Sequence, residues 1–187
     1  MDTNRPTRQL PIDLSELALV FDNRDQGFSH YLDLGTGQVI SISEDAQRHL
    51  EEIYDEYFDE ETDQPQFEAI LAQMDLYDWQ REELLLAKQI DGDLSQRYLR
   101  VPVIESRAGY RDMVSFIDTV QNPRLKTRLE RAIAGSGAFR AFKDLLADYP
   151  KERQRWFEFK ENCLQERVRR WLADEGIEPV GFASPAR

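Results

Sequence analysis

The sequence is poor in cysteine and histidine and has no long apolar run, and each shortage removes a class of function. Cys163 is the single cysteine, so no intrachain disulfide can form. Two histidines, His30 and His49, cannot build a common zinc site with one thiol unless several carboxylates join them. No apolar run approaches the ~20 residues that cross a bilayer, and the N-terminal residues lack the basic-then-apolar order of a signal peptide. We therefore expect a cytoplasmic protein that makes no membrane contact.

Nucleotide-binding motifs are also missing. The sequence has no GxxxxGK[ST] pattern. Gly35-Thr36-Gly37 and Gly135-Ser136-Gly137 both begin like GxGxxG, but Ile40 and Arg140 occupy the third glycine position. Neither stretch follows a strand and opens a helix within a βαβ unit, as binding of a pyrophosphate requires. We expect no nucleotide and no other cofactor.

Catalytic and metal-binding residues cannot be singled out either. Cys163 lies in an apolar helical stripe, as an inert core cysteine does. Eight of the 13 residues from Glu51 to Asp63 are acidic, which is typical of a solvated helix face but would also suit a weak divalent-cation site. Asp91-Gly92-Asp93 lacks the rest of a calcium loop. Carboxylates are so abundant that any catalytic pair would be arbitrary, so we name no catalytic residue and no metal ligand.

The charge is unevenly distributed along this acidic chain. The formal net charge is −12, whereas residues 121–172 carry 13 Lys+Arg and 7 Asp+Glu. The remaining residues carry 11 Lys+Arg and 29 Asp+Glu. Two interpretations stay open: acidic and basic faces that attract each other within one fold, or a surface that binds a partner.

The hydrophobic pattern predicts an α+β fold that is mostly helical. A Gly-rich turn between residues 31–34 and 39–42 predicts a β-hairpin, and residues 98–104 predict a third strand, placed at an edge by Pro102. Helical periodicity predicts helices over residues 14–21, 44–58, 67–74, 79–90, 110–120, 123–134, 139–146 and 151–174. We expect a flexible lead-in (1–12), one domain (13–176) and a flexible tail (177–187). The sheet-bearing half of the domain, about 13–105, precedes a helical half, about 106–176.

The stretch GSGAFRAFKDLL predicts a corner between two helices. Gly135 is expected to end one helix and Ser136 to cap the next. The apolar residues of the second helix are expected to enter the core: Phe139, Phe142, Leu145 and Leu146.

The basic helical half offers candidate contacts to an anion or a partner. Arg140 and Lys143 lie three positions apart and off the phenylalanine stripe. Trp156 and Trp171 suit base stacking but also fit a core stripe, which is the commoner use. The candidate contact residues are Arg140, Lys143, Arg153, Arg155, Lys160 and Arg167.

The segment RLERAIAGSGAFRAFKDLL carries a family resemblance, together with Pro150, Trp156, Phe159 and the closing WLADEGIEP. The upstream stretches YLDLGTGQVISISED and FIDTVQNPRL share it. The sequence resembles an uncharacterised bacterial protein family of the UPF class over most of residues 14–177. The resemblance implies a small soluble α+β protein and brings no activity and no catalytic residue with it.

The leading hypothesis is a non-enzymatic protein that binds another macromolecule, most simply a protein. It rests on the lack of an assembled catalytic motif and on the segregated charge. The alternative is an RNA- or phosphate-binding module that uses the basic helical half, and a weaker alternative is an enzyme that uses carboxylates.

Overall fold

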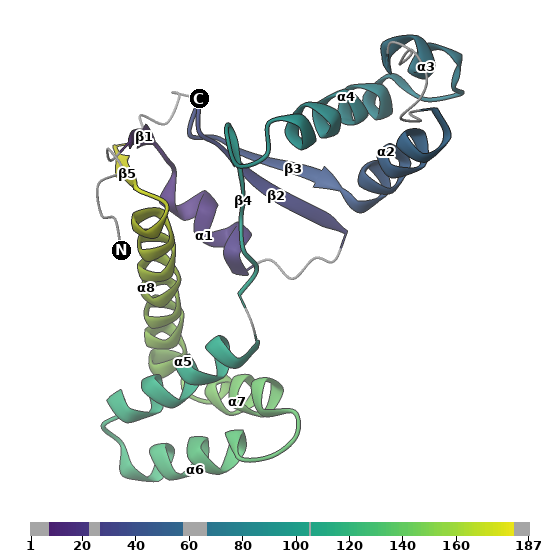
Figure 1. Ribbon diagram of the computed structural model, residues 1–187. Coiled ribbons are helices and arrows are strands. Elements are labelled where there is room, and N and C mark those ends of the chain that lie inside the picture. Colours follow the sequence, from purple (N-terminus) through teal and green to yellow (C-terminus); the bar gives the residue numbers. More distant parts are fainter. Residues whose placement is uncertain (1–7, 23–26, 58–66, 105, 182–187) are drawn as a thin grey trace. The chain divides into compact units, whose positions relative to one another are not determined.

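The fold is a mainly helical α+β arrangement, as the hydrophobic pattern predicts (Figure 1). A computed structural model describes residues 8–22, 27–57, 67–104 and 106–181. The helices are α1 (Leu14–Asp22), α2 (Glu44–Tyr57), α3 (Phe67–Gln73), α4 (Asp78–Gly92), α5 (Ser106–Thr119), α6 (Pro123–Ile133), α7 (Ala138–Ala147) and α8 (Pro150–Asp174). The strands are β1 (Arg8–Pro11), β2 (Phe28–Asp33), β3 (Val39–Ser43), β4 (Tyr98–Arg100) and β5 (Ile177–Val180).

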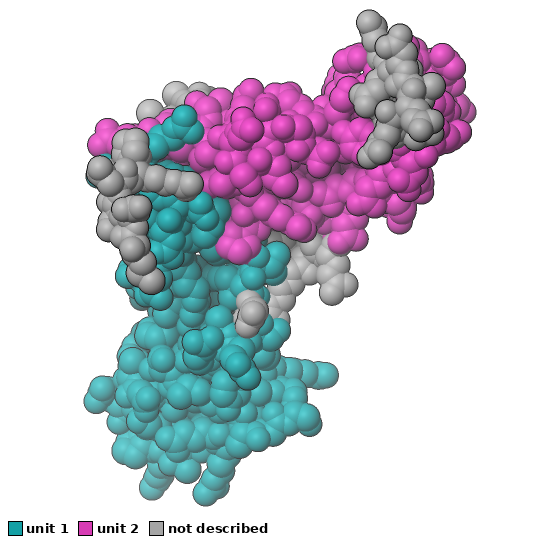
Figure 2. Space-filling model, viewed as in Figure 1, with its two compact units in different colours: residues 1–8, 17–22, 103–178 teal, residues 9–16, 23–102, 179–187 magenta. Residues whose placement is uncertain are grey.

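The chain divides into two compact units, drawn in teal and magenta in Figure 2. Unit 1 comprises residues 1–8, 17–22 and 103–178. Unit 2 comprises residues 9–16, 23–102 and 179–187. Unit 2 therefore holds the three-stranded sheet with α2–α4, and unit 1 holds α5–α8.

The sheet of unit 2 is antiparallel, in the order β3-β2-β4. Tyr31 of the central strand lies opposite Ile40 on one side and opposite Arg100 on the other. Residues directly opposite each other share a face of the sheet, so these three side chains point the same way. The predicted hairpin is confirmed, and so is the position of the third strand at the edge of the sheet. This strand is shorter than predicted, because β4 ends at Arg100 and Pro102 lies beyond it.

The hairpin turn is organised by Asp33 and depends on Gly37. The Asp33 carboxylate accepts a hydrogen bond from the Gly35 N–H at 2.7 Å, and the Asp33 carbonyl accepts one from the Gly37 N–H, also at 2.7 Å. Gly37 has a φ of +77°, and a Cβ there would lie 2.4 Å from the Pro11 carbonyl oxygen. Position 37 therefore requires glycine for both conformation and space.

Helices α2, α3 and α4 form a hydrophobic core with one face of this sheet. The buried side chains of α2 recur at helical spacing and meet Tyr31 and Ile42 of the sheet. The core residues are Tyr31, Ile42, Ala46, Leu50, Ile53, Phe67, Ile70, Leu71, Leu84, Ala87, Ile90 and Tyr98.

Unit 1 is built around a cluster of aromatic rings. Phe142 of α7 lies 4.9 Å from Trp156 of α8 and 6.1 Å from Phe116 of α5, measured between ring centroids. Both contacts are edge-to-face, the geometry that aromatic pairs prefer. Trp156 is therefore part of the core and is not exposed for base stacking.

The corner between α6 and α7 differs from its prediction in two details. Ser136 does not cap α7; Gly137 occupies the N-cap position with a φ of 74°. The N-cap position of α7 has a left-handed conformation, which favours glycine. Gly137 therefore occupies this position, and Ser136 precedes it. Phe139 is 37% exposed, whereas Phe142 is fully buried. Phe142 and Leu146, one turn apart, face the core, and this spacing leaves Phe139 at its margin.

Helix α4 and the two chain-end strands add detail that the sequence pattern does not give. Tyr77 is the N-cap of α4, and its N–H donates to Gln80 Oε1 at 3.0 Å. Strands β1 and β5 fall within the segments expected to be a lead-in and a tail, and they form a two-stranded sheet. Short strands at chain ends carry too few residues for a readable pattern of alternation.

Candidate functional site

Unit 2 carries an apolar groove beside the first turns of α2 and α4, which we call the α2–α4 groove. It encloses about 470 Å³. Its lining residues are Phe28, Ser43, Asp45, Ala46, His49, Trp79, Gln80, Glu83 and Leu84. Ala46 and Leu84 belong to the core of unit 2, so the floor of the groove is continuous with that core.

Two large aromatic side chains of the α2–α4 groove are accessible to solvent. Trp79 is 61% exposed and Phe28 is 45% exposed. A large apolar side chain stabilises a fold when it is buried in the core. An exposed tryptophan contributes little to that stability. Exposed aromatic residues beside a groove are typical of surfaces that bind other molecules.

The charged residues that line this apolar groove are acidic. Asp45 and Glu83 are among its lining residues, which include neither Lys nor Arg among the described residues. One Glu83 oxygen accepts a hydrogen bond from the Ser43 N–H at 2.8 Å, which fixes this carboxylate beside the groove. Residues 23–102 as a whole carry 6 Lys+Arg and 19 Asp+Glu, a balance of −13. The field around the groove therefore favours a cationic ligand.

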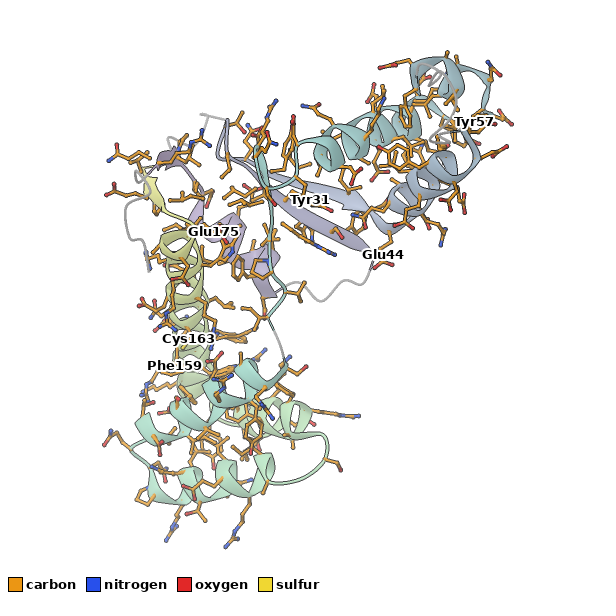
Figure 3. The ribbon with its side chains drawn as sticks, viewed as in Figure 1. Tyr31, Glu44, Tyr57, Phe159, Cys163 and Glu175 are labelled. Carbon is orange, nitrogen blue, oxygen red and sulfur yellow. The ribbon has the colours of Figure 1, made fainter. Side chains whose placement is uncertain are left out.

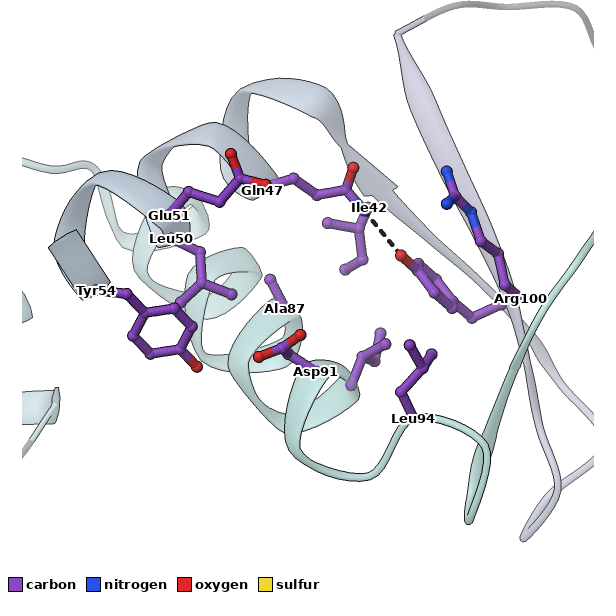
Figure 4. A pocket seen from close by; sticks show the side chains of 11 residues that line it. Ile42, Gln47, Leu50, Glu51, Tyr54, Ala87, Asp91, Leu94 and Arg100 are labelled. Atoms are coloured by element: carbon purple, nitrogen blue, oxygen red, sulfur yellow. Dashed lines mark hydrogen bonds between the residues drawn. The ribbon is translucent and has the colours of Figure 1, made fainter. Parts of the chain in front are cut away.

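A second pocket of unit 2, which we call the tyrosine pocket, lies between the sheet and the α2/α4 pair (Figure 4). Its volume is about 270 Å³. One stripe of α2, one stripe of α4 and one face of the sheet supply its walls. The lining residues are Tyr31, Ile42, Gln47, Leu50, Glu51, Tyr54, Ala87, Ile90, Asp91, Leu94 and Arg100.

A chain of hydrogen bonds crosses one wall of the tyrosine pocket. Arg100 Nη2 donates to Ser29 Oγ at 3.3 Å, and Ser29 Oγ donates to Gln47 Oε1 at 3.2 Å. Gln47 Nε2 donates to the Tyr31 hydroxyl at 2.8 Å, the dashed line in Figure 4. Figure 3 shows Tyr31 on the sheet. This network holds Gln47 and Tyr31 in fixed positions at the pocket wall.

Tyrosine and carboxylate side chains meet at another part of the same pocket. Burial raises the pKa of the Tyr54 phenol, and the charge of Asp91 together with a hydrogen bond to it raises the pKa further. The Tyr54 phenol and the Asp91 carboxylate therefore lie close together in the lining of the pocket. Glu51, three positions before Tyr54 on α2, lies on the same side of that helix.

The structure spreads the six predicted contact cations over α7 and α8 of unit 1 rather than gathering them in one pocket. Three of them bind within unit 1. Arg155 donates to Glu152 and Thr119, Lys160 pairs with Asp22, and Arg167 pairs with Asp112. The other three are on the surface: Arg140 pairs with Asp144 at 3.7 Å, Arg153 lies over the Phe157 ring, and Lys143 is exposed.

Cys163 is half-buried on α8 and lines a third pocket, of about 410 Å³ (Figure 3). Burial raises the pKa of its thiol, and the charge of the buried Asp112 adds to this. Asp112 in turn binds Arg167 through both carboxylate oxygens. The sequence predicts an inert cysteine within the core, whereas Cys163 is half-buried and lines a pocket, so its reactivity stays a prediction.

Within the described ranges, no group of three or more His, Cys, Asp or Glu side chains is placed to hold a metal ion. Residues 58–63 of the acidic run lie outside those ranges. No helix in the described part of the chain is both long enough and apolar enough to cross a membrane.

The residues of both pockets in unit 2 are absent from the predicted contact set. Trp79 lies about 140° around the helix from the buried Leu84 but only about 20° from the buried Ile90. The periodicity of this helix therefore does not mark Trp79 as exposed. The tyrosine pocket has no local signal either, because its walls come from segments 31–54 and 87–100 that only the fold brings together.

The fold defines a mainly helical α+β protein. The model of the uncharacterised protein family UPF0158 matches residues 65–184, well over half of the chain. The chain therefore belongs to the UPF0158 family, which confirms the resemblance found in the sequence. It is also similar to the UPF0158 protein PA5073 of Pseudomonas aeruginosa, with 28% identity over 178 residues that cover 95% of this chain and 92% of that protein. No solved structure matches.

Proposed function

We propose that this protein is a non-enzymatic cytoplasmic module that binds another protein through the α2–α4 groove. The groove receives a partner segment that carries a large apolar side chain next to Lys or Arg. The observation that carries the proposal is Trp79, which lies 61% exposed at the edge of an apolar groove. Burying such a ring in a partner removes apolar surface from water, and tryptophan is among the commonest residues that dominate binding energy.

The chemistry of the partner follows from the two parts of the groove. Phe28, Ala46 and Leu84 offer an apolar surface for one side chain. Asp45 and Glu83 flank that surface with negative charge, within a unit that is itself strongly acidic. An acidic partner or a nucleic acid would be repelled there, whereas Lys or Arg would be attracted and would speed association.

A second candidate function is contact with RNA or phosphate through unit 1. It is supported by Arg140, whose side chain is 90% exposed, and by the exposed Lys143 on the same helix. Binding of this kind weakens steeply with salt. A single-stranded oligouridylate titrated at low and high salt tests it. Arg140→Glu combined with Lys143→Glu is expected to abolish binding, and absence of binding at low salt removes this candidate.

A pull-down with the tagged full chain tests the leading proposal. Lysates are divided into nuclease-treated and untreated arms, and bound material is identified by mass spectrometry and nucleic-acid staining. We expect a specific protein companion that resists nuclease and is lost with Trp79→Ala. The control is Phe157→Ala, because Phe157 is 49% exposed on unit 1 and lies outside the groove.

Two results would overturn the proposal. One is a set of companions that is the same for the parent protein and Trp79→Ala. The other is a companion that disappears with nuclease, which would favour the nucleic-acid candidate instead.

A further inference from the structure

The tyrosine pocket has the size and the mixed lining of a small-molecule site, and it uses none of the residues of the α2–α4 groove. Its apolar walls come from Ile42, Leu50 and Ile90, which belong to the core. Its volume of about 270 Å³ is just below the range of about 300–1,000 Å³ that is usual for ligand pockets. The pocket therefore suits a compact metabolite rather than a nucleotide.

The wall formed by the sheet offers hydrogen-bond donors. Tyr31 is only 7% exposed, and its hydroxyl oxygen accepts a hydrogen bond from Gln47. No described residue accepts the hydroxyl proton of Tyr31, so this buried donor is available to a ligand in the pocket. Arg100 lies opposite Tyr31 in the sheet register and lines the same pocket with a positive charge. A buried donor and a guanidinium together favour a carboxylate.

The helical walls offer acceptors instead. The Asp91 carboxylate accepts from the Tyr54 phenol and retains further lone pairs. Glu51 is a second carboxylate in the lining. Apart from Arg100, the lining residues include neither Lys nor Arg among the described residues. Two carboxylates against an apolar floor favour a compact ammonium group.

We propose that the tyrosine pocket binds a small zwitterion, with its carboxylate at Tyr31 and Arg100 and its ammonium group at Asp91 and Glu51. The ligand class is an amino acid or a short amino carboxylate, whose methylene groups contact Leu50 and the rest of the apolar floor. This site is independent of partner binding at Trp79, so Trp79→Ala leaves it unchanged.

The test is a titration of the full chain, followed by amide chemical shifts. The probes are unbranched amino carboxylates from glycine to 6-aminohexanoate. Butyrate and butylamine are the controls that carry one charged end only. We expect at least one zwitterion to shift amides of the pocket, and to bind about tenfold more tightly than either control, since one charge-assisted hydrogen bond is worth about that factor.

Variants of the residues proposed to bind the carboxylate and the ammonium group test whether the chemical-shift changes arise from the proposed contacts. Tyr31→Phe keeps the ring and removes the hydroxyl, and Asp91→Asn removes one negative charge. Each is expected to weaken binding about tenfold, with Glu51→Gln as a second variant of the ammonium end. Tyr77→Phe, an exposed tyrosine outside the pocket, is expected to have no effect. The proposal is overturned if no zwitterion binds below about 10 mM, or if binding is equal in the parent, Tyr31→Phe and Asp91→Asn proteins.

Discussion

The guanidinium of Arg97 donates two hydrogen bonds to the carboxylate of Asp33, at 3.1 and 3.0 Å, although 64 positions separate the two residues. The same carboxylate holds the Gly35 N–H in the hairpin turn. Arg97 immediately precedes β4, so this ion pair connects the turn between β2 and β3 to the strand on the other side of β2. One buried carboxylate therefore stabilises the geometry of the whole three-stranded sheet.

Asp33→Asn is expected to destabilise unit 2 because it removes the charge that Arg97 pairs with while keeping an acceptor for Gly35. Hydrogen exchange of the Gly35 and Gly37 amides measures the effect. Both amides should exchange faster in the variant. Asp144→Asn is the matched control, since Asp144 belongs to an exposed pair with Arg140 and surface pairs contribute little. Unchanged exchange in Asp33→Asn would contradict the role given to this carboxylate.

The contribution of Asp33 to stability is expected to depend on pH. The hydrogen bond from Arg97 lowers the pKa of Asp33 below its ordinary value. A carboxyl group whose folded-state pKa is lowered stabilises the fold above its unfolded pKa, about 3.9, and loses that contribution as pH falls through the folded-state pKa. Urea unfolding of parent and Asp33→Asn proteins should give a constant difference from pH 7 to about pH 5. The difference should shrink below about pH 4, and a difference independent of pH would refute this origin.

Gly37→Ala is expected to destabilise the protein by more than about 1 kcal/mol, because the conformation is left-handed and the Pro11 carbonyl occupies the space. Gly92→Ala provides the comparison. A Cβ at position 92 would meet nothing within 4 Å, and alanine is favoured over glycine in a helix by about 1 kcal/mol. Thermal unfolding should therefore order the three proteins as Gly92→Ala, parent, Gly37→Ala, from most to least stable.

Phe142 and Phe139, three positions apart on α7, should respond differently to truncation. Phe142 is fully buried against Phe116 and Trp156, and its replacement by alanine is expected to cost about 3–5 kcal/mol. Phe139→Ala should cost well under half of that, because 37% of the residue is exposed. Chemical unfolding monitored by far-UV circular dichroism measures both. Equal losses of unfolding free energy in Phe142→Ala and Phe139→Ala would show that the assignment of the buried and exposed faces of α7 is wrong.

The pH dependence of the alkylation rate of Cys163 is expected to depend on Asp112, its buried neighbour. Burial and the Asp112 carboxylate raise the pKa of the thiol, so alkylation should be slow at neutral pH. Asp112→Asn removes a negative charge and should move the midpoint of the rate–pH profile to lower pH. Asp118→Asn, an exposed residue of the same helix, should not move it. Cys163 is the single cysteine, so no other thiol contributes to the signal.

Local sequence signals are sufficient for the helices, the hairpin and the family, but not for strands β1 and β5 or for the pockets of unit 2. The helices and the hairpin follow from apolar periodicity and from the Gly35–Gly37 turn, which depend on neighbouring residues. The pairing of Asp33 with Arg97, and of Tyr31 with Gln47, depends on strand pairing and helix packing over long sequence separations. The basic contacts are predicted mainly from charge, and charge does not reveal that Asp112, Asp22 and Glu152 bind three of those cations.

Short random peptides can be selected on the immobilised protein after depletion on the Trp79→Ala variant. This selection identifies the side chains that the α2–α4 groove binds, without knowledge of the natural partner. Peptides that bind the parent protein but not the variant should share one large apolar side chain next to Lys or Arg, and their binding should weaken as salt rises. Recovery of acidic peptides, or of peptides that bind Trp79→Ala equally well, would contradict partner binding through this groove.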